Sequence, residues 1–507
     1  MSGRPVGVVT GGGGGIGAAV AEELGRQGWF VVTMDPLVSL DGTERLPEPE
    51  ETTAGRIVAA GGEARATNVS VTDADAVREE VARLVEERGR LDAVVNVAGI
   101  TRPTGFASGT EDDWRSVLSV HLDGYRNVLA AALPVMASAG RGRILGVTSG
   151  SGWRPADAGA YSCAKRAVAS LTWQLGALAP DGVSVNAMSP IAVTRMVTAA
   201  LARAAAGSGK ATGGLSLGSM PQPDELGPLG AHLVSEELGW CRGQVVFVGG
   251  SEAAVVEPPR LLEVAPVDAV EVVVPGAFVP AEQAQASGGG SNPRFVLDAA
   301  AGQVSAGGRS CVVVTDRADV GAALAARLGS CRIVGADATV DDLGDADAVV
   351  LALGGMPSAS GVHGWERVLA EHDGIAERIH ADARWARAVA DLGRPVRLVT
   401  LTDATTAGGR SRAQAAAQLA RAGRGATGDR VTAFAVAVEG TTIEAGCALA
   451  GHLVSTDDVA LAGAELVAGD GWVGLRSHPR PGGSVVLGGT AIPPWFDATL
   501  RQLVGAR

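Results

Sequence analysis

The sequence is short of lysine and tyrosine. Of its 42 basic residues only Lys165 and Lys210 are lysine, and Tyr125 and Tyr161 are the only tyrosines. The net charge is −13, and no run of basic residues forms a local positive patch. Such a chain repels a phosphate backbone, which excludes nucleic acid as a partner. No apolar run reaches the ~20 residues that span a bilayer, and no signal-peptide pattern is visible, so we expect a cytoplasmic protein without a membrane segment.

Cysteine is scarce as well, and the five cysteines form neither a CxxC pair nor a metal-ligand spacing. They are typical of buried apolar residues in a reducing compartment, so we expect no disulfide framework and no metal site. The remaining composition is globular, with 46% hydrophobic and 19% charged residues. At roughly 100 to 200 residues per domain, the length allows two to four domains with full cores.

Strand-like and helical patterns alternate along the first part of the chain. Val6–Thr10 is a short β-branched run, a row of glycines follows, and Ala18–Gly25 has helical character. A second strand-like run, Phe30–Asp35, comes next. The alternation continues to a strand at Gln244–Val248, which predicts a parallel sheet with helices on both faces.

The same order of segments starts again after a Pro- and Gly-rich connection. Segments of the second part match segments of the first in the same order, which we interpret as a tandem duplication with a shortened second copy. We therefore expect an α/β protein with two Rossmann-like, doubly wound parallel-sheet domains in tandem, 1–250 and 294–507, joined by a linker over 251–293, with the second domain degenerate. The matched pairs are Cys311–Thr315 with Val6–Thr10, Asp347–Gly355 with Asp92–Gly99, Pro395–Thr402 with Gly142–Ser149, Gly451–Ser455 with Ala231–Ser235, and Gly482–Gly489 with Gly243–Gly250.

A glycine-rich turn, TGGGGGIG, joins the first strand to the first helix. Glycine permits positive φ and lets backbone N–H groups approach a pyrophosphate at a helix N-terminus. A flexible surface loop is the alternative, and the position between a strand and a helix disfavours it. The residues expected to contact a dinucleotide here are Thr10, Gly11, Gly13, Gly14, Gly15, Ile16 and Gly17.

Asp35 stands at the end of the second strand-like run. A carboxylate there accepts hydrogen bonds from the ribose hydroxyls of adenosine and repels a 2′-phosphate, which favours NAD over NADP. No Arg or Lys occurs between Gly11 and Gly17 to bind that phosphate, which agrees. The alternative is a solvated loop aspartate.

Tyr161 and Lys165 are four residues apart in a helical pattern, so their side chains share one face. A phenol with a pKa of about 10 is a poor base at neutral pH, and a nearby ammonium lowers that pKa. An exposed Tyr–Lys helix pair is the alternative. The scarcity of both residue types makes chance placement at this spacing improbable.

Together these motifs resemble the short-chain dehydrogenase/reductase family over residues 1–250, with Asn96-Val97-Ala98-Gly99 for the usual NNAG. The resemblance implies that Ser149 hydrogen-bonds the substrate oxygen, that Tyr161 exchanges the hydroxyl proton, and that Lys165 lowers the tyrosine pKa and holds the nicotinamide ribose. It also implies NAD as cofactor, with contacts from Asn68, Val69, Asn96, Ala98, Gly99, Pro190, Val193 and Thr194.

One departure from the family pattern is His121, which replaces the catalytic asparagine of the fourth helix. This residue, the excursion over residues 36–56 and the segment Ser189–Met196 resemble the subgroup containing the (3R)-hydroxyacyl-CoA dehydrogenase of peroxisomal multifunctional enzyme type 2. His121 is expected either to carry the proton relay, titrating near neutrality, or to pack within its helix.

The other departure is the second half, which contains neither Tyr nor Lys. Arg410, Gln414 and Asp403 stand where the tyrosine, lysine and serine would fall, and Asp316 and Asp319 put negative charge where a pyrophosphate would sit. We expect no chemistry there and interpret it as a pseudo-subunit covering the helix faces through which family members associate. The chain would then be an intramolecular pseudo-dimer, or two chains a homodimer that resembles a tetramer.

The sequence thus predicts an NAD(H)-dependent oxidoreductase that interconverts a secondary alcohol and a ketone, with a 3-hydroxyacyl thioester as one substrate class. Polyketide, steroid or other carbocyclic ketones are the alternative substrates. An NAD-binding scaffold or sensor without turnover is the alternative of another class. Trp153 is expected to line the substrate pocket or to anchor a loop, and Leu201–Leu217 to form a mobile lid.

Overall fold

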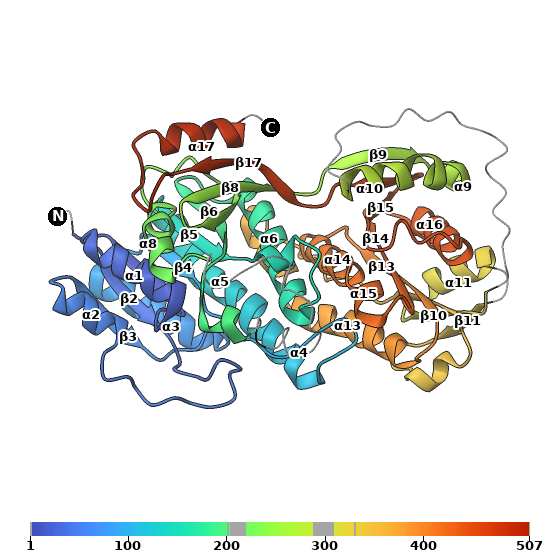
Figure 1. Ribbon diagram of the computed structural model, residues 1–507, viewed down its shortest axis with the longest axis horizontal. Helices are drawn as coiled ribbons and strands as arrows, with labels where there is room; N and C mark the ends of the chain where they lie inside the picture. The colour runs from blue at the N-terminus through green and yellow to red at the C-terminus, as the bar shows by residue number, and fades with distance from the viewer. Residues whose placement is uncertain (1–2, 200–201, 203–219, 287–308, 329–330, 506–507) are drawn as a thin grey trace.

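Two mixed, mostly parallel sheets lie side by side, each covered by helices on both faces (Figure 1). They are seen in a computed structural model that describes residues 3–199, 202, 220–286, 309–328 and 331–505. The predicted α/β class is confirmed. None of the helices in these ranges is long and apolar enough to cross a bilayer.

The first sheet has nine strands in the order β17-β8-β7-β6-β5-β4-β1-β2-β3. The strands from β3 to β7 run parallel, and β8 and β17 extend one edge in antiparallel pairs. The strands are β1 (Val6–Thr10), β2 (Phe30–Met34), β3 (Glu63–Thr67), β4 (Ala93–Asn96), β5 (Gly142–Val147), β6 (Val183–Pro190), β7 (Val245–Gly249), β8 (Glu252–Glu257) and β17 (Arg480–Val486).

Helices cover both faces of this sheet. α3 shows why they begin and end where they do: the Asp73 side chain accepts a hydrogen bond from the Ala76 N–H, and Gly89 closes the helix with φ of 72°. On one face lie α1 (Gly15–Arg26), α2 (Thr53–Ala59) and α8 (Pro223–His232). On the other lie α3 (Ala74–Arg88), α4 (Glu111–Leu118), the π-helical turn η1 (Ser119–Asp123), α5 (Gly124–Ala139) and α6 (Gly159–Leu178).

The second sheet repeats the strand order of the first, without a counterpart of β3: β11-β10-β12-β13-β14-β15-β16-β9. Its strands are β10 (Cys311–Thr315), β11 (Cys331–Val334), β12 (Ala348–Ala352), β13 (Val396–Asp403), β14 (Val431–Val438), β15 (Glu465–Gly469), β16 (Trp472–Arg476) and β9 (Leu261–Pro266). Its helices are α11 (Ala318–Leu328), η6 (Val340–Leu343), α12 (Gly364–Glu371), α13 (Ile375–Asp391), α14 (Ala407–Ala420), α15 (Gly423–Thr427) and α16 (Glu444–Ser455).

Each half contributes its last strand to the sheet of the other. β9 follows β8 in the chain, yet it pairs with β16 in the second sheet. β17 follows β16, yet it pairs with β8 in the first sheet, and α17 (Phe496–Gly505) accompanies it (Figure 1). The short helices that accompany β9 are η4 (Val267–Ala269), α9 (Val270–Val273), η5 (Val274–Phe278) and α10 (Val279–Ala286).

This exchange corrects two expectations. The interval 251–293 is not a plain linker, because residues 252–286 form β8, β9 and the helices of the exchanged segment, while its densest Gly-rich part, Ser287–Pro293, lies outside the described residues. The match of Gly482–Gly489 to Gly243–Gly250 is also wrong, because β15 occupies the position of β7 and β17 closes the other sheet. A Gly-flanked Val run suits any edge strand, so composition alone misled the comparison.

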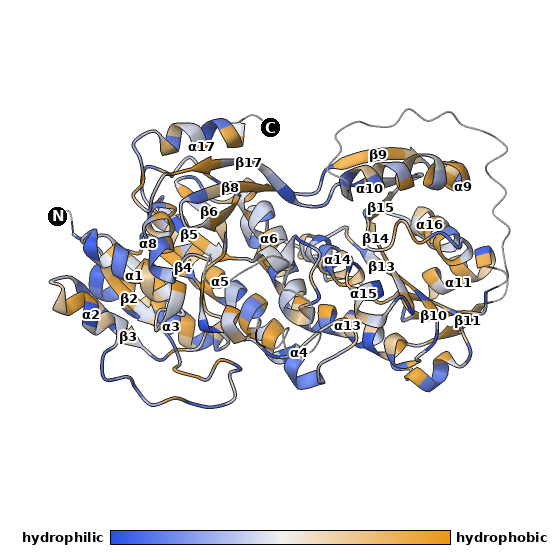
Figure 2. Ribbon diagram, in the orientation of Figure 1, coloured by the Kyte–Doolittle hydropathy of each residue, from blue (hydrophilic) through white to orange (hydrophobic). Residues whose placement is uncertain are grey.

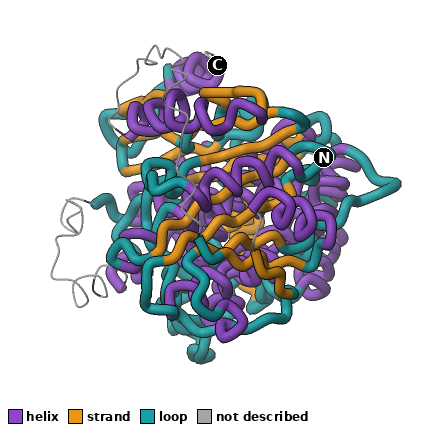
Figure 3. The backbone as a smooth tube through the Cα atoms, turned by 90° about the vertical axis from the view of Figure 1, so that its right-hand side faces the viewer, coloured by secondary structure: helices purple, strands orange, loops and turns teal. Residues whose placement is uncertain are grey.

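The two halves share one core. A continuous cluster of buried apolar side chains extends from Val8 and Val94 of the first sheet to Val349 and Leu398 of the second. In its middle α6 packs along α14, both rich in Ala, and small side chains allow such close approach. Figure 2 shows apolar residues concentrated in the strands, and the turned view in Figure 3 shows the strands enclosed by helices.

Candidate active site

The predicted site residues lie at the carboxyl ends of the parallel strands of the first sheet. The glycine-rich turn follows β1, Asn96 ends β4, Ser149 comes two residues after β5, and Pro190 ends β6. Tyr161 comes from the first turn of α6. Carboxyl ends of parallel strands meet at one edge, which is where open α/β sheets bind ligands.

The glycine-rich turn is built for a close backbone approach. Gly11 and Gly15 have φ of 65° and 55°, and a Cβ added at Gly17 would lie 2.2 Å from the Gly11 carbonyl oxygen. Gly14 caps α1 without a side-chain hydrogen bond, so the first N–H groups of the helix are not used by a capping side chain. These groups fit an anionic pyrophosphate.

Asp35 lies against this turn. Its two carboxylate oxygens accept hydrogen bonds from the backbone N–H groups of Gly13 and Leu37, both at 3.0 Å. Its own N–H donates to the Thr67 carbonyl at 2.9 Å, which places the next residues, exposed Asn68 and half-buried Val69, beside it. The structure therefore brings the three predicted adenosine contacts to one corner of the site.

Arg195 reaches the glycine-rich turn from the segment after β6, although the sequence analysis did not single it out. Its Nη2 atom lies 3.7 Å from the position of a Cβ at Gly14, and the Thr194 methyl group lies 3.9 Å from one at Gly15. The turn itself has no Arg or Lys between Gly11 and Gly17, and Arg195 supplies a nearby cation from outside the motif. The sequence shows both the TRM tripeptide and the glycine-rich turn, but it does not show that the two lie close together in the fold.

The segment Asn96–Gly99, at the end of β4, packs against the start of the glycine-rich turn. The Thr10 hydroxyl donates to Asn96 Oδ1 at 2.8 Å and accepts from the Ala98 N–H at 3.2 Å. A Cβ at Gly99 would lie 2.4 Å from His121 Cε1, so only glycine fits there. Beyond β6, the Val193 N–H donates to the Pro221 carbonyl at 2.8 Å.

Ser149, Tyr161 and Lys165 come together. The nearby Ser149 side chain lowers the pKa of Tyr161, although burial has the larger effect and raises it. Lys165 Nζ lies 5.6 Å from the centre of the Tyr161 ring and donates to the Val147 carbonyl at 2.6 Å. Burial lowers the pKa of Lys165 to about 7. The Lys165 amine therefore gains and loses its proton near neutral pH.

His121 lies in the π-helical turn η1, an irregularity that is frequent at functional sites. Its ring makes an edge-to-face contact with Tyr161, with centroids 5.0 Å apart, and its Nε2 lies 2.7 Å from the Ile100 carbonyl oxygen. Burial and the charge of Lys165 lower its pKa well below the usual range, which favours the packing interpretation over titration near neutrality. Nδ1 is buried and has no hydrogen-bond partner among the described residues.

Trp153 is 5% exposed, and its indole N–H donates to the Ser189 hydroxyl at 3.0 Å. These contacts are those of a loop anchor, one of the two interpretations of this residue. Of the expected lid, Leu201–Leu217, only Ala202 belongs to the described residues.

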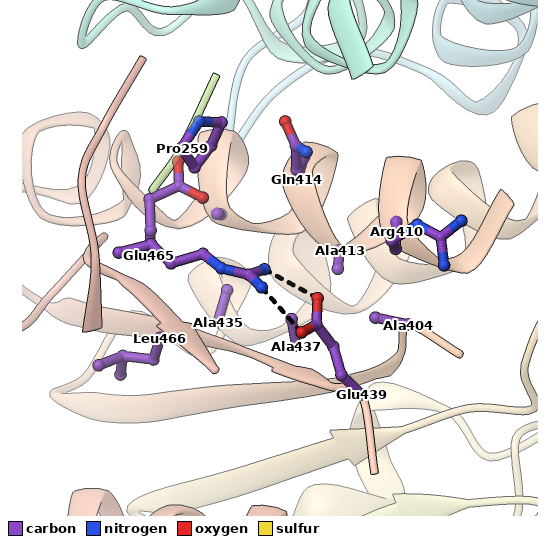
Figure 4. A pocket seen from close by; sticks show the side chains of 12 residues that line it. Pro259, Ala404, Arg410, Ala413, Gln414, Ala435, Ala437, Glu439, Glu465 and Leu466 are labelled. Atoms are coloured by element: carbon purple, nitrogen blue, oxygen red, sulfur yellow. Dashed lines mark hydrogen bonds and ion pairs between the residues drawn. The ribbon is translucent and has the colours of Figure 1, made fainter. Parts of the chain in front are cut away.

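The corresponding edge of the second sheet contains a pocket whose lining includes Arg410 and Gln414 (Figure 4). Across it, the Arg476 guanidinium donates to both carboxylate oxygens of Glu439 at 2.8 and 2.7 Å. In the turn after β10, Arg317 pairs with Asp319 at 2.7 Å. The residues at this edge thus pair with one another, and their chemistry differs from that of the first half.

Comparison with known proteins finds the model of the short chain dehydrogenase family matching residues 5–205. The short-chain reductase protein NovJ of Streptomyces niveus is 34% identical over 49% of this chain and 94% of its own. The 3-oxoacyl-[acyl-carrier-protein] reductase FabG of Thermotoga maritima is 30% identical over 48% of this chain and 95% of its own. A peroxisomal hydratase-dehydrogenase-epimerase of Neurospora crassa is 30% identical over 49% of this chain but only 26% of its own.

Proposed function

Because the chain belongs to the short-chain dehydrogenase family, we propose that its first half transfers a hydride between NAD(H) and a secondary alcohol or ketone. The observation that carries this proposal is that Ser149, Tyr161 and Lys165 come together, with the buried Lys165 Nζ 5.6 Å from the centre of the Tyr161 ring. A protein that only binds a dinucleotide has no use for this arrangement.

In the oxidative direction the Tyr161 oxygen accepts the proton of the substrate hydroxyl, and in the reductive direction the phenol returns it. Ser149 hydrogen-bonds the substrate oxygen as its charge develops. Lys165 stabilises the phenolate form of Tyr161 when it is charged. His121, neutral in this site, packs against the tyrosine ring and restricts its orientation.

The bound nicotinamide supplies or accepts the hydride. The glycine-rich turn and Arg195 would hold its pyrophosphate, and Asp35 the adenosine ribose, with Asn68 and Val69 at the adenine. Asn96 would pack beneath the adenine side of the cofactor. Lys165 would hold the nicotinamide ribose, and Thr194 would face the carboxamide. Preference for NAD over NADP rests on the carboxylate of Asp35.

The substrate class is proposed to be a 3-oxoacyl or 3-hydroxyacyl thioester. The similarity to the 3-oxoacyl-[acyl-carrier-protein] reductase of Thermotoga maritima supports this choice over polyketide or steroid ketones. His121 also supports it through the subgroup that the sequence resembles.

The second half is proposed to be a pseudo-subunit without chemistry of its own. Support comes from the packing of α6 along α14 and from the core that both halves share. Two such chains would form a homodimer, each chain with one working site. Titration calorimetry should then give one NAD equivalent per chain, and two equivalents would contradict the proposal.

The test of the activity compares the two tyrosines of the chain. Tyr161→Phe should lower kcat by roughly 10² or more, the typical contribution of a positioned acid or base, with NAD binding retained. Tyr125→Phe removes the other phenol hydroxyl, from α5, and should turn over a 3-hydroxyacyl thioester like the wild type. Equal turnover by Tyr161→Phe would refute the role, and NAD binding without turnover by the wild type would favour the scaffold alternative.

A further inference from the structure

The loop between Ser149 and α6 is held by the second half of the chain. Gln418, on α14, donates its side-chain N–H groups to the Ser151 and Arg154 carbonyl oxygens, both at 2.9 Å. Arg421, just after α14, donates to the Trp153 carbonyl at 2.9 Å. Gln418 is 1% exposed, so water does not compete for these bonds.

These contacts continue to the candidate catalytic serine. The Ser151 hydroxyl donates to Ser149 Oγ at 3.0 Å, and the Ser151 N–H donates to the same atom at 3.3 Å. Ser149 Oγ therefore accepts two hydrogen bonds from its own loop, and its own proton stays available for a substrate oxygen. Both hydrogen bonds to Ser149 Oγ come from Ser151, so the orientation of Ser149 depends on the position of Ser151. Gln418 fixes that position through its hydrogen bond to the Ser151 carbonyl.

We propose that Gln418, assisted by Arg421, is a positioning residue supplied by the second half, which orients Ser149 through Ser151 and fixes the shape of the substrate loop. This inference rests on the proposed function of Ser149. The second half would then contribute to the site itself, in addition to covering the apolar helix faces of the first half. The first half alone would keep its catalytic residues, but Ser149 would lose its alignment.

The chain offers a matched control in Gln174, on α6. This glutamine also crosses between the halves, donating to the Ala407 carbonyl at 3.2 Å and the Ser411 hydroxyl at 3.1 Å, but it does not contact the substrate loop. Replacing either glutamine by methionine keeps the length of the side chain and removes its hydrogen bonds. The two variants therefore separate loop positioning from general loss of contacts between the halves.

In the full-length protein, Gln418→Met should lower kcat/KM for the alcohol or ketone by roughly tenfold, because two buried hydrogen bonds to the loop are lost. The Kd for NAD should stay within about twofold, because the glycine-rich turn is untouched. Ser151→Ala should show the same kinetic signature, and Gln174→Met should not. Equal kinetic effects of the two glutamine variants, or a parallel loss of NAD affinity in Gln418→Met, would overturn the proposal.

Hydrogen exchange supplies a readout that needs no substrate. Amides of residues 149–158 should exchange faster in Gln418→Met than in the wild type, and should be unchanged in Gln174→Met. If the wild type turns over no alcohol or ketone, the proposed function fails while this measurement still decides the positioning role. Unchanged exchange in Gln418→Met would overturn that role.

Discussion

Replacing Asp35 by asparagine should relax the cofactor preference. In the structure the carboxylate lies beside the glycine-rich turn, held by the N–H groups of Gly13 and Leu37, and an asparagine keeps the shape while removing the charge. A 2′-phosphate carries about 1.5 to 2 negative charges. Two unit charges about 4 Å apart repel by about 1 kcal/mol in water and about 4 kcal/mol near a protein surface.

Asp35 is half-buried, and the cationic Arg195 lies near the same turn, so we take a value toward the lower end of that range. A net repulsion of about 2 kcal/mol corresponds to a preference of roughly thirtyfold for NADH over NADPH. The Asp35→Asn variant should lose most of that preference, mainly through a gain in kcat/KM with NADPH.

The assay compares kcat/KM for the two reduced cofactors with one saturating ketone. Asp41→Asn is the control, because it removes another carboxylate close in sequence to Asp35. The Asp41 carboxylate accepts hydrogen bonds from the Ser39 and Thr43 hydroxyls, which lower its pKa to about 2. This control should leave the cofactor ratio within about twofold. A wild-type preference for NADPH, or the same change in both variants, would refute the electrostatic argument.

Three further outcomes are expected. His121→Asn should keep most of the turnover and an unchanged pH profile between about pH 6 and 8, because the histidine is already neutral there; complete loss with NAD still bound would show a specific relay role. Burial lowers the pKa of His372 from 6.5 to about 4. Between these two pH values His372 is protonated in the unfolded chain and neutral in the folded chain, so the free energy of unfolding falls as the pH drops below 6.5. Urea unfolding should show about 2 kcal/mol less stability at about pH 5 than at about pH 8 from this group, and His372→Gln should lack that part; an unaltered pH dependence would contradict it. Residues 1–250 alone, which lack β17 and α17 and expose the contact face of α6, should aggregate or self-associate in size-exclusion chromatography, and a well-behaved active monomer would disprove the need for the second half.

The sequence was sufficient for features that local chemistry determines. The strand, glycine-rich turn and helix at Val6–Arg26 follow from positive φ at Gly11 and from the spacing of apolar residues. Tyr161 and Lys165 share a face because they are four residues apart on a helix. The second α/β unit was likewise predictable from the recurrence of the same segment order.

Other features depend on contacts between distant segments. β9 and β17 are short antiparallel edge strands, and each pairs in the sheet of the other half, which no local pattern in their sequences marks. The approach of Arg195 to Gly14 and the neutral state of His121 depend on how β6 and η1 are placed. The contacts of Gln418 cross from one half to the other, and no local pattern marks them.

The exchange of β9 and β17 also affects the synthesis of the protein. When the ribosome has made β8, the strand that will pair with its free edge is still more than 200 residues away. At about 5 to 20 residues per second, the edge of the first sheet stays unpaired for roughly 11 to 45 seconds. Nascent chains are therefore most exposed to aggregation in that interval, and a chain that stops early leaves the edge of its first sheet open for good.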